Sequence, residues 1–304
     1  MAFRGGSSGP LILAPLVALM IAMLSFASGG AIAKTLIEAV GAPGATALRM
    51  ALASVLLLVF WRPWRVWPDV FRRAGTRALR DIAIYGAAMG GMNLLFYSAL
   101  NRLPLGIAVA VEFTGPLALA MLSSRRAVDF LWIGLATAGL LVLLPIGARA
   151  SALDPIGIAY ALGAGVCWAA YILFGKRAGA GFGGEITALG MLVGALLVVP
   201  FGIISAGTRV LQVSIWPAAV GVAVLSSALP YSLEMFALTR LPTRTFGILM
   251  SLEPALGALA AFCFLGERLT VVQWLAVFGI ILASGGSAAT APSGAGVTHA
   301  PEAG

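Results

Sequence analysis

The hexapeptide Ala-Leu-Asn-Arg-Leu-Pro at residues 99–104 recurs as Ala-Leu-Thr-Arg-Leu-Pro at residues 237–242. Weak internal symmetry of this kind is how structural repeats are detected from a sequence. Because further matches occur in the same order and at nearly one spacing, they indicate an internal duplication of the chain. These matches are Pro116 with Pro254 and Thr-Ala-Leu-Arg-Met at 46–50 with Thr-Ala-Leu-Gly-Met at 187–191.

The composition places the chain in a lipid bilayer. Of its 304 residues, 61% are hydrophobic and only 10% are charged, and the mean hydropathy is +1.02. Soluble domains are about 45–50% apolar and about 25% charged, and disordered chains combine low hydrophobicity with high charge. A water-soluble globule and a disordered chain are therefore both excluded.

Ten apolar stretches follow one another, and a helix needs roughly 20 apolar residues to cross a bilayer. Three of them hold one charge well inside the run, namely 43–61 with Arg49, 104–122 with Glu112 and 245–265 with Glu253. The sequence therefore predicts an all-α integral membrane protein with ten transmembrane helices. The charge-free stretches are 5–33, 82–101, 130–148, 155–175, 186–208, 210–233 and the run from 269 into the tail.

The duplication divides these helices into two groups of five. We expect the first repeat over residues 11–148 and the second over 154–287, after a short N-terminal segment, 1–10. The tail, 288–304, is rich in Gly, Ala, Ser, Thr and Pro, a composition typical of disorder. Because five is odd, the second repeat enters the membrane upside down. Inverted repeats are typical of secondary transporters, whose substrate site lies near the midplane between the halves.

The net charge of +8 at pH 7 is a topology signal. Most Lys and Arg residues flank the apolar stretches on the side of the N-terminus, whereas the other side carries only Arg102, Arg149, Arg209 and Arg268. Since cytoplasmic loops are enriched in Lys and Arg, we expect both termini in the cytoplasm. No nucleic-acid partner is expected, because the positive charge lies between apolar stretches.

Small residues and proline predict breaks in the helices. A straight first helix over residues 11–38 would be about 42 Å long, more than the roughly 30 Å core of a bilayer. We therefore expect it to bend or tilt, with the break at Gly29 and Gly30, since Gly and Ser pairs are common causes of kinks. Pro230 predicts a further break in the eighth helix.

Glu112 and Glu253 are the strongest candidates for a functional site. Each lies near the midplane, and each is followed by a proline, Pro116 or Pro254, that frees a backbone carbonyl one turn earlier. Ionisable groups at this depth are costly and are functional candidates by default. We interpret them as a paired site for a proton or an ammonium group. The alternative is that they are protonated and only hydrogen-bond a neighbouring helix.

Charged residues nearer the helix ends have two readings. Lys34 lies four residues before Glu38, the spacing of a helical ion pair, and Arg49 lies toward the outer end of the second helix. Lys34 and Arg49 either snorkel to water or bind a substrate carboxylate, and the sequence leaves both readings open. Glu234 lies within two turns of Arg240, which favours an interfacial salt bridge over a ligand role.

Asn93, Tyr97 and Tyr231 are candidates for lining a polar cavity. Asn93 and Tyr231 occupy equivalent positions of the two repeats. The signal is weak, because tyrosine is common near membrane interfaces for reasons of solvation alone. The GxxxG spacing, which permits close approach of helices, occurs at Gly86 and Gly90 and again at Gly190 and Gly194.

The sequence contains few residues that could catalyse a reaction or bind a cofactor. The only histidine, His299, lies in the tail, which removes histidine-based triads, metal sites and proton relays. The chain has neither a Gly-Lys-Ser/Thr phosphate loop nor a dinucleotide-binding fingerprint. We expect no enzyme, no cofactor and no metal, and an ion gradient instead of ATP. A membrane-embedded lipid-modifying enzyme is the remote alternative.

Five runs are specific enough to carry a family resemblance. They resemble the drug/metabolite transporter superfamily with tandem EamA-type domains and, within it, bacterial threonine and homoserine exporters. The resemblance extends from about residue 15 to residue 283. The runs are Val-Gly-Ala-Pro-Gly at 40–44, Pro-Leu-Gly-Ile-Ala-Val-Ala-Val-Glu-Phe-Thr-Gly-Pro at 104–116, Ser-Ser-Arg-Arg at 123–126, Ala-Leu-Pro-Tyr-Ser-Leu-Glu-Met at 228–235 and Leu-Pro-Thr-Arg-Thr-Phe-Gly at 241–247.

This resemblance implies efflux of small amino acids across the bacterial inner membrane in exchange for protons. The expected partners are the amino-acid substrate, protons and the lipid bilayer, and a homodimer is compatible with the sequence. The alternative of the same class is an exporter of other metabolites or drugs. The resemblance transfers no residue roles, so the candidate site depends on the physical argument above.

Overall fold

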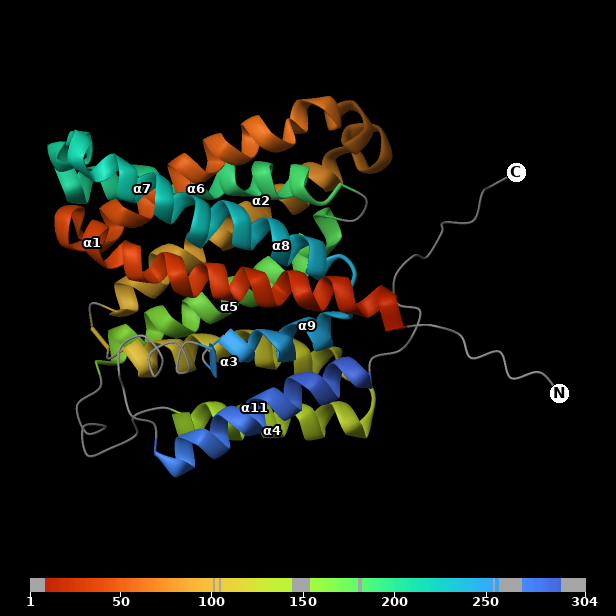
Figure 1. Ribbon diagram of the computed structural model, residues 1–304. Coiled ribbons are helices and arrows are strands. Elements are labelled where there is room, and N and C mark those ends of the chain that lie inside the picture. The colour runs from red at the N-terminus through yellow and green to blue at the C-terminus, as the bar shows by residue number, and fades with distance from the viewer. Residues whose placement is uncertain are drawn as a thin grey trace, which may run out of the picture.

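A computed structural model describes residues 9–100, 102–103, 105–143, 154–179, 182–253, 255–256 and 270–290. Throughout these residues the regular structure is helical (Figure 1). The helices are α1 (Gly9–Trp61), η1 (Pro63–Arg65), α2 (Trp67–Leu100), α3 (Leu105–Ser123), α4 (Ala127–Leu143), α5 (Pro155–Ala178), α6 (Gly184–Ala206), η3 (Gly207–Leu211), η4 (Val213–Ile215), α7 (Trp216–Ala223), η5 (Val224–Ala228), α8 (Leu229–Leu238), α9 (Thr243–Met250) and α11 (Val271–Ala289).

The helices are apolar enough to make this a multi-pass membrane protein. In the described part of the chain, five helices are long enough to cross a bilayer, and shorter apolar helices accompany them. Large apolar side chains are exposed on the outside, with Leu122 at 80% and Ile204 at 83%. In water such a surface would be a liability, whereas lipid tails solvate it. The long spans are Thr35–Trp61, Gly75–Ala99, Pro155–Ala178, Gly184–Leu211 and Val213–Leu238.

The first two expected helices are joined in α1, and the break between them lies at Gly41. Its φ of 74° and ψ of 164° are non-helical and suit glycine, which has no Cβ to clash. The prediction of a break at Gly29 and Gly30 is wrong, because both residues stay within the helix. Gly29 serves close packing instead, since a Cβ there would overlap the side chain of Ser226.

The two halves of the chain interleave. In the membrane-crossing bundle α1 packs on α6, α7 and α8, α2 packs on α5 and α6, and α3 packs on α5 and α9. Figure 1 shows α11 lying along α4, so the last described helix also finds its partner in the other half. The core is therefore built between the halves instead of within each one.

The GxxxG glycines of the two halves form one of the close contacts between helices. Cβ atoms built on Gly86 and Gly90 of α2 would meet the backbone carbonyls of Gly190 and Gly194 of α6, at 2.5 and 2.9 Å. No real side chain fits at such distances, so the packing interpretation of the GxxxG spacing is confirmed.

The ninth expected helix is described only as α9 and residues 251–253 and 255–256; Pro254 lies outside the described residues.

Candidate functional site

A cavity of about 80 Å³ lies inside the helix bundle. Its wall combines aromatic rings with three glutamates, drawn from both halves of the chain. This mixture of apolar surface with a few polar groups is typical of small-molecule sites. The lining residues are Phe26, Met92, Asn93, Phe96, Glu112, Trp168, Tyr171, Tyr231, Glu234, Met250 and Glu253.

The three glutamates come from three helical segments. Glu112 lies in α3, Glu234 lies in α8, and Glu253 follows α9. Glu112 and Glu234 are buried, and Glu253 is half-buried. None of the three forms an ion pair with Lys or Arg among the residues the structure describes. Carboxylates removed from water without counter-ions are costly, so this cluster favours the binding of protons or of a cationic group.

Glu234 has a partner other than the one expected. The Tyr171 hydroxyl donates a hydrogen bond of 2.8 Å to the Glu234 carboxylate. Arg240 instead lies over the ring of Phe236 and donates to its carbonyl. The salt-bridge interpretation was therefore wrong, because six residues along a helix place Glu234 and Arg240 on different faces.

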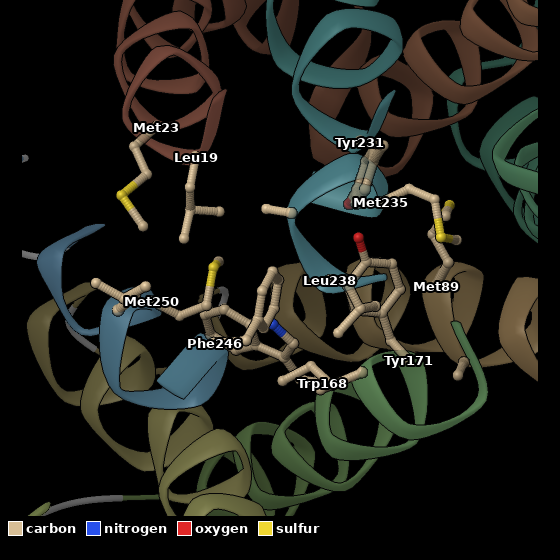
Figure 2. Packing of buried hydrophobic residues seen from close by; sticks show 14 of the residues in the cluster. Leu19, Met23, Met89, Trp168, Tyr171, Tyr231, Met235, Leu238, Phe246 and Met250 are labelled. Atoms are coloured by element: carbon tan, nitrogen blue, oxygen red, sulfur yellow. The ribbon is translucent and has the colours of Figure 1, made fainter. Parts of the chain in front are cut away.

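Tyrosine rings surround this hydrogen bond. Tyr171 stacks on Tyr85 with ring centres 5.2 Å apart, and its ring meets Tyr231 edge-on at 5.8 Å. Figure 2 shows Tyr171 reaching from α5 toward α8, where Tyr231 is placed. This packing fixes the Tyr171 hydroxyl, which is therefore oriented before any ligand arrives.

Arg49 is buried in the bundle, with only 3% of its surface exposed. Its guanidinium donates to the carbonyl of Ser226 at 3.0 Å and to the side-chain oxygen of Asn93. Snorkelling to water is therefore not what Arg49 does. The sequence leaves the two readings of Arg49 open, because depth along a helix does not reveal which neighbours cover that face.

The π-helical turn before α8 explains the acceptor that Arg49 uses, and the helix continues through Pro230 without the expected break. Residues of η5 form a π-helical turn, and Pro230 cannot donate to the carbonyl of Ser226 four residues earlier. The Arg49 guanidinium donates to this carbonyl in place of the missing backbone N–H. The neighbouring carbonyl of Leu225 accepts a hydrogen bond of 2.7 Å from the Ser25 hydroxyl. Side chains of the first half thus satisfy the loosened backbone of the second.

Asn93 connects Arg49 to the cavity. Its amide nitrogen donates to the Met89 carbonyl at 2.8 Å and to the Tyr231 hydroxyl at 3.2 Å. Asn93 and Tyr231 are 138 residues apart, so equivalent positions of the two repeats touch each other. Two other lining pairs have the same separation, Phe96 with Glu234 and Glu112 with Met250.

The proline after Glu112 lies one turn beyond it in α3, outside the lining residues. Pro116 is part of α3, and a Cβ built on Gly165 of α5 would lie 2.5 Å from the carbonyl of Glu112. The carbonyl that Pro116 frees therefore faces a glycine of the neighbouring helix, where the two backbones approach closely.

Two predicted site residues fall away from the cavity or cannot be placed. Tyr97 is half-buried and packs edge-on against Phe96, outside the lining residues. Lys34 lies within α1, but its side chain is outside the described ones, and Glu38 is exposed. Sequence reasoning missed Trp168 and Tyr171, whose only signal is a polar-edged aromatic within an apolar stretch.

Comparisons with known proteins agree on one family. The EamA-like transporter family matches residues 13–144 and 155–287. The threonine/homoserine exporter RhtA of Salmonella typhimurium strain LT2 is 54% identical over 276 residues, which is 91% of this chain and 92% of its own. RhtA of Escherichia coli K12 is 53% identical over the same span.

The fold also has a solved counterpart. A crystal structure of a protein with 21% identity superposes with a TM-score of 0.72, covering 91% of this chain and 96% of its own. That likeness shows the arrangement of helices. The family follows from the match to both halves and from the identity above one half: the chain belongs to the EamA-like transporter family.

Proposed function

We propose that this protein is a secondary transporter that exports small amino acids, threonine and homoserine among them, across the bacterial inner membrane. The observation that carries the proposal is the cavity between the halves, in which three glutamates without ionic partners in the described part face aromatic rings. The identity of 53–54% with threonine/homoserine exporters supports the choice of substrate.

In this proposal Glu112 and Glu253 couple the export of the amino acid to the entry of a proton. Both carboxylates line one cavity, so an ammonium group held by them and a proton bound to them compete for the same negative charge. A substrate loads from the cytoplasm onto the ionised carboxylates. A proton arriving from outside neutralises one of them and releases the ammonium group. The exchange of one positive charge for another keeps the buried site near neutrality.

The repeats provide the alternation between the two sides. We propose that the second repeat, over residues 154–287, is inverted relative to the first, over 11–148, and that both termini are cytoplasmic. The contact between equivalent positions Asn93 and Tyr231 supports a pseudo-two-fold axis beside the cavity. A site on such an axis can open to either side by movement of one half against the other.

A second candidate is export of a different small molecule by the same fold. The aromatic share of the lining, with Phe26, Phe96 and Trp168, favours it. Export assays that compare threonine with cationic dyes separate the two candidates, because a dye exporter lowers dye accumulation and leaves threonine unchanged.

Accumulation of radiolabelled threonine in cells with and without the protein tests the proposal. We expect lower accumulation when the protein is present, and restoration of the label when Glu112→Gln replaces the wild type. Glu38→Gln is the matched control, since Glu38 is an exposed glutamate of α1 away from the cavity. Unchanged accumulation of every small amino acid would rule the proposal out.

A further inference from the structure

We infer that Arg49, acting through Asn93 and Tyr231, forms the end of the cavity that receives the α-carboxylate of the substrate. The inference rests on the proposed function and specifies it further. It requires that a substrate carry both a free carboxylate and an ammonium group. Simple amines and amino-acid amides are then poor substrates.

The first argument is the missing anion. Arg49 is 3% exposed, and among the described residues it has no Asp or Glu within ion-pair distance. The two groups that accept hydrogen bonds from it, the Ser226 carbonyl and the Asn93 amide oxygen, are both neutral. A buried cation without a counter-ion is costly inside a membrane, and such residues mark sites where an anion binds.

The second argument is an unused donor of Arg49 itself. In the part of the chain that the structure describes, the Nε–H of this buried side chain has no acceptor. Buried donors are nearly always satisfied in folded proteins, so an unsatisfied one on a buried cation indicates a ligand that supplies an acceptor. A carboxylate is a ligand that offers acceptors only.

The third argument is the path from Arg49 to the cavity. Arg49 occupies the oxygen of the Asn93 side chain, which turns the amide nitrogen toward the Tyr231 hydroxyl. The Tyr231 oxygen accepts this bond, so its own proton is available to donate. Asn93 and Tyr231 both line the cavity. The cavity therefore presents a hydroxyl donor backed by a fixed positive charge, an arrangement that attracts a carboxylate.

The fourth argument is the complement on the rest of the wall. Glu112, Glu234 and Glu253 line the same cavity and offer negative charge to an ammonium group. A small amino acid carries both charges on neighbouring atoms, so one molecule compensates Arg49 and the glutamates together. An amine leaves Arg49 without an anion, and a hydroxy acid leaves the glutamates without a cation.

Competition for counterflow in proteoliposomes tests this inference. The wild-type protein exchanges radiolabelled threonine, and unlabelled threonine or threonine amide is added as competitor. The amide keeps the ammonium group and the hydroxyl and removes only the negative charge. We expect the amide to compete at least tenfold more weakly than threonine. Equal competition by the amide would overturn the inference while leaving threonine export in place.

Variants assign the preference to Arg49. We expect Arg49→Gln to weaken competition by threonine about tenfold and to bring the threonine-to-amide ratio close to one, since the amide never used the charge. Arg49→Lys keeps the positive charge and should retain part of the preference for threonine over threonine amide. Arg209→Gln, in η3, is the control that should keep all of it. A folded Arg49→Gln protein with the full preference would refute the role of Arg49.

Folding is checked separately from transport. Each variant is compared with the wild type by thermal unfolding in detergent and by size-exclusion chromatography. If Arg49→Gln does not fold, Arg49→Lys carries the test of Arg49, and a folded Arg49→Lys protein with the full preference counts against it. The wild-type ratio between threonine and its amide still tests whether the site requires a carboxylate. Absence of threonine counterflow in the wild type would overturn the proposed function, and this inference with it.

Discussion

The two halves of the transporter place different side chains at equivalent positions around one cavity. The first half contributes Phe96 where the second contributes Glu234, and Glu112 where the second contributes Met250. In both pairs an acid in one half is matched by an apolar side chain in the other. The backbone is thus repeated, while the charges are not. A symmetric frame can open to either side, and an asymmetric lining can still hold a polar substrate in one orientation.

The largest effect is expected where glycines of α2 and α6 bring the backbones of the two halves together. Gly90→Leu in α2 places a side chain against the backbone of Gly194 in α6. We expect a loss of about 3 kcal/mol or more in folding stability, the upper range for overpacking, measured by thermal unfolding and by yield. Gly134→Leu is the control, because no atom lies within 4 Å of a Cβ built there. Equal loss in both variants would show that this contact is not what limits stability.

The next effect concerns the acids on which coupling depends. We expect Glu112→Gln to abolish the dependence of threonine efflux on an imposed pH gradient, with a fall in rate of about 10- to 100-fold, the cost of a bond to a charged group. Efflux and counterflow in proteoliposomes measure it, with Glu38→Gln as control. A Glu112→Gln protein that retains full pH-dependent efflux removes Glu112 from the coupling role.

A smaller effect is expected for the partner of Glu234. Tyr171→Phe removes the hydroxyl that donates to this carboxylate and keeps the ring contacts with Tyr85 and Tyr231. We expect the apparent affinity for threonine to fall about tenfold, since Glu234 loses its donor within the cavity. Tyr97→Phe is the matched control, because Tyr97 lies outside the lining. Equal affinities of the two variants would mean that the hydroxyl only packs.

The smallest effect is expected at the junction between the halves. Asp154 caps α5 by accepting from the Ile156 N–H at 2.9 Å and pairs with Arg102 at 2.7 Å. The bond from Arg102, followed by the backbone bond, holds the pKa of Asp154 below its usual value near 3.8. A lowered pKa in the folded state means stability that is present above the unfolded value and lost as the pH falls through the folded one.

Asp154→Asn tests this reasoning by thermal unfolding at several pH values. We expect a slight destabilisation at pH 6, because the amide keeps a capping oxygen and loses the ion pair. The difference from wild type should shrink below about pH 4, where the unfolded carboxyl takes up a proton. A difference that stays constant down to pH 3 would contradict the ion-pair explanation.

Much of the fold could be predicted from the sequence, because hydrophobic runs and glycine spacing act locally. The GxxxG residues face each other, and Asn93 and Tyr231 line the cavity as expected. Two errors are local, since the non-helical residue in α1 is Gly41 and not Gly29 or Gly30, and the helix continues through Pro230. The other concerns a long-range partner, since Glu234 accepts from Tyr171 instead of pairing with Arg240. The role of Arg49, which the sequence leaves open, also depends on distant groups, Ser226 and Asn93, that no local pattern identifies.

The π-helical turn before α8, whose carbonyls accept from side chains of the first half, has a consequence for biogenesis. Arg49 is synthesised 177 residues before its acceptor Ser226, and Asn93 precedes Tyr231 by 138 residues. During translation these two polar side chains therefore enter the bilayer ahead of the groups that will satisfy them. The early helices must therefore remain loosely assembled at the translocon until the later helices arrive. A ribosome that stops near the middle of the message leaves a truncated product whose polar side chains are exposed to lipid.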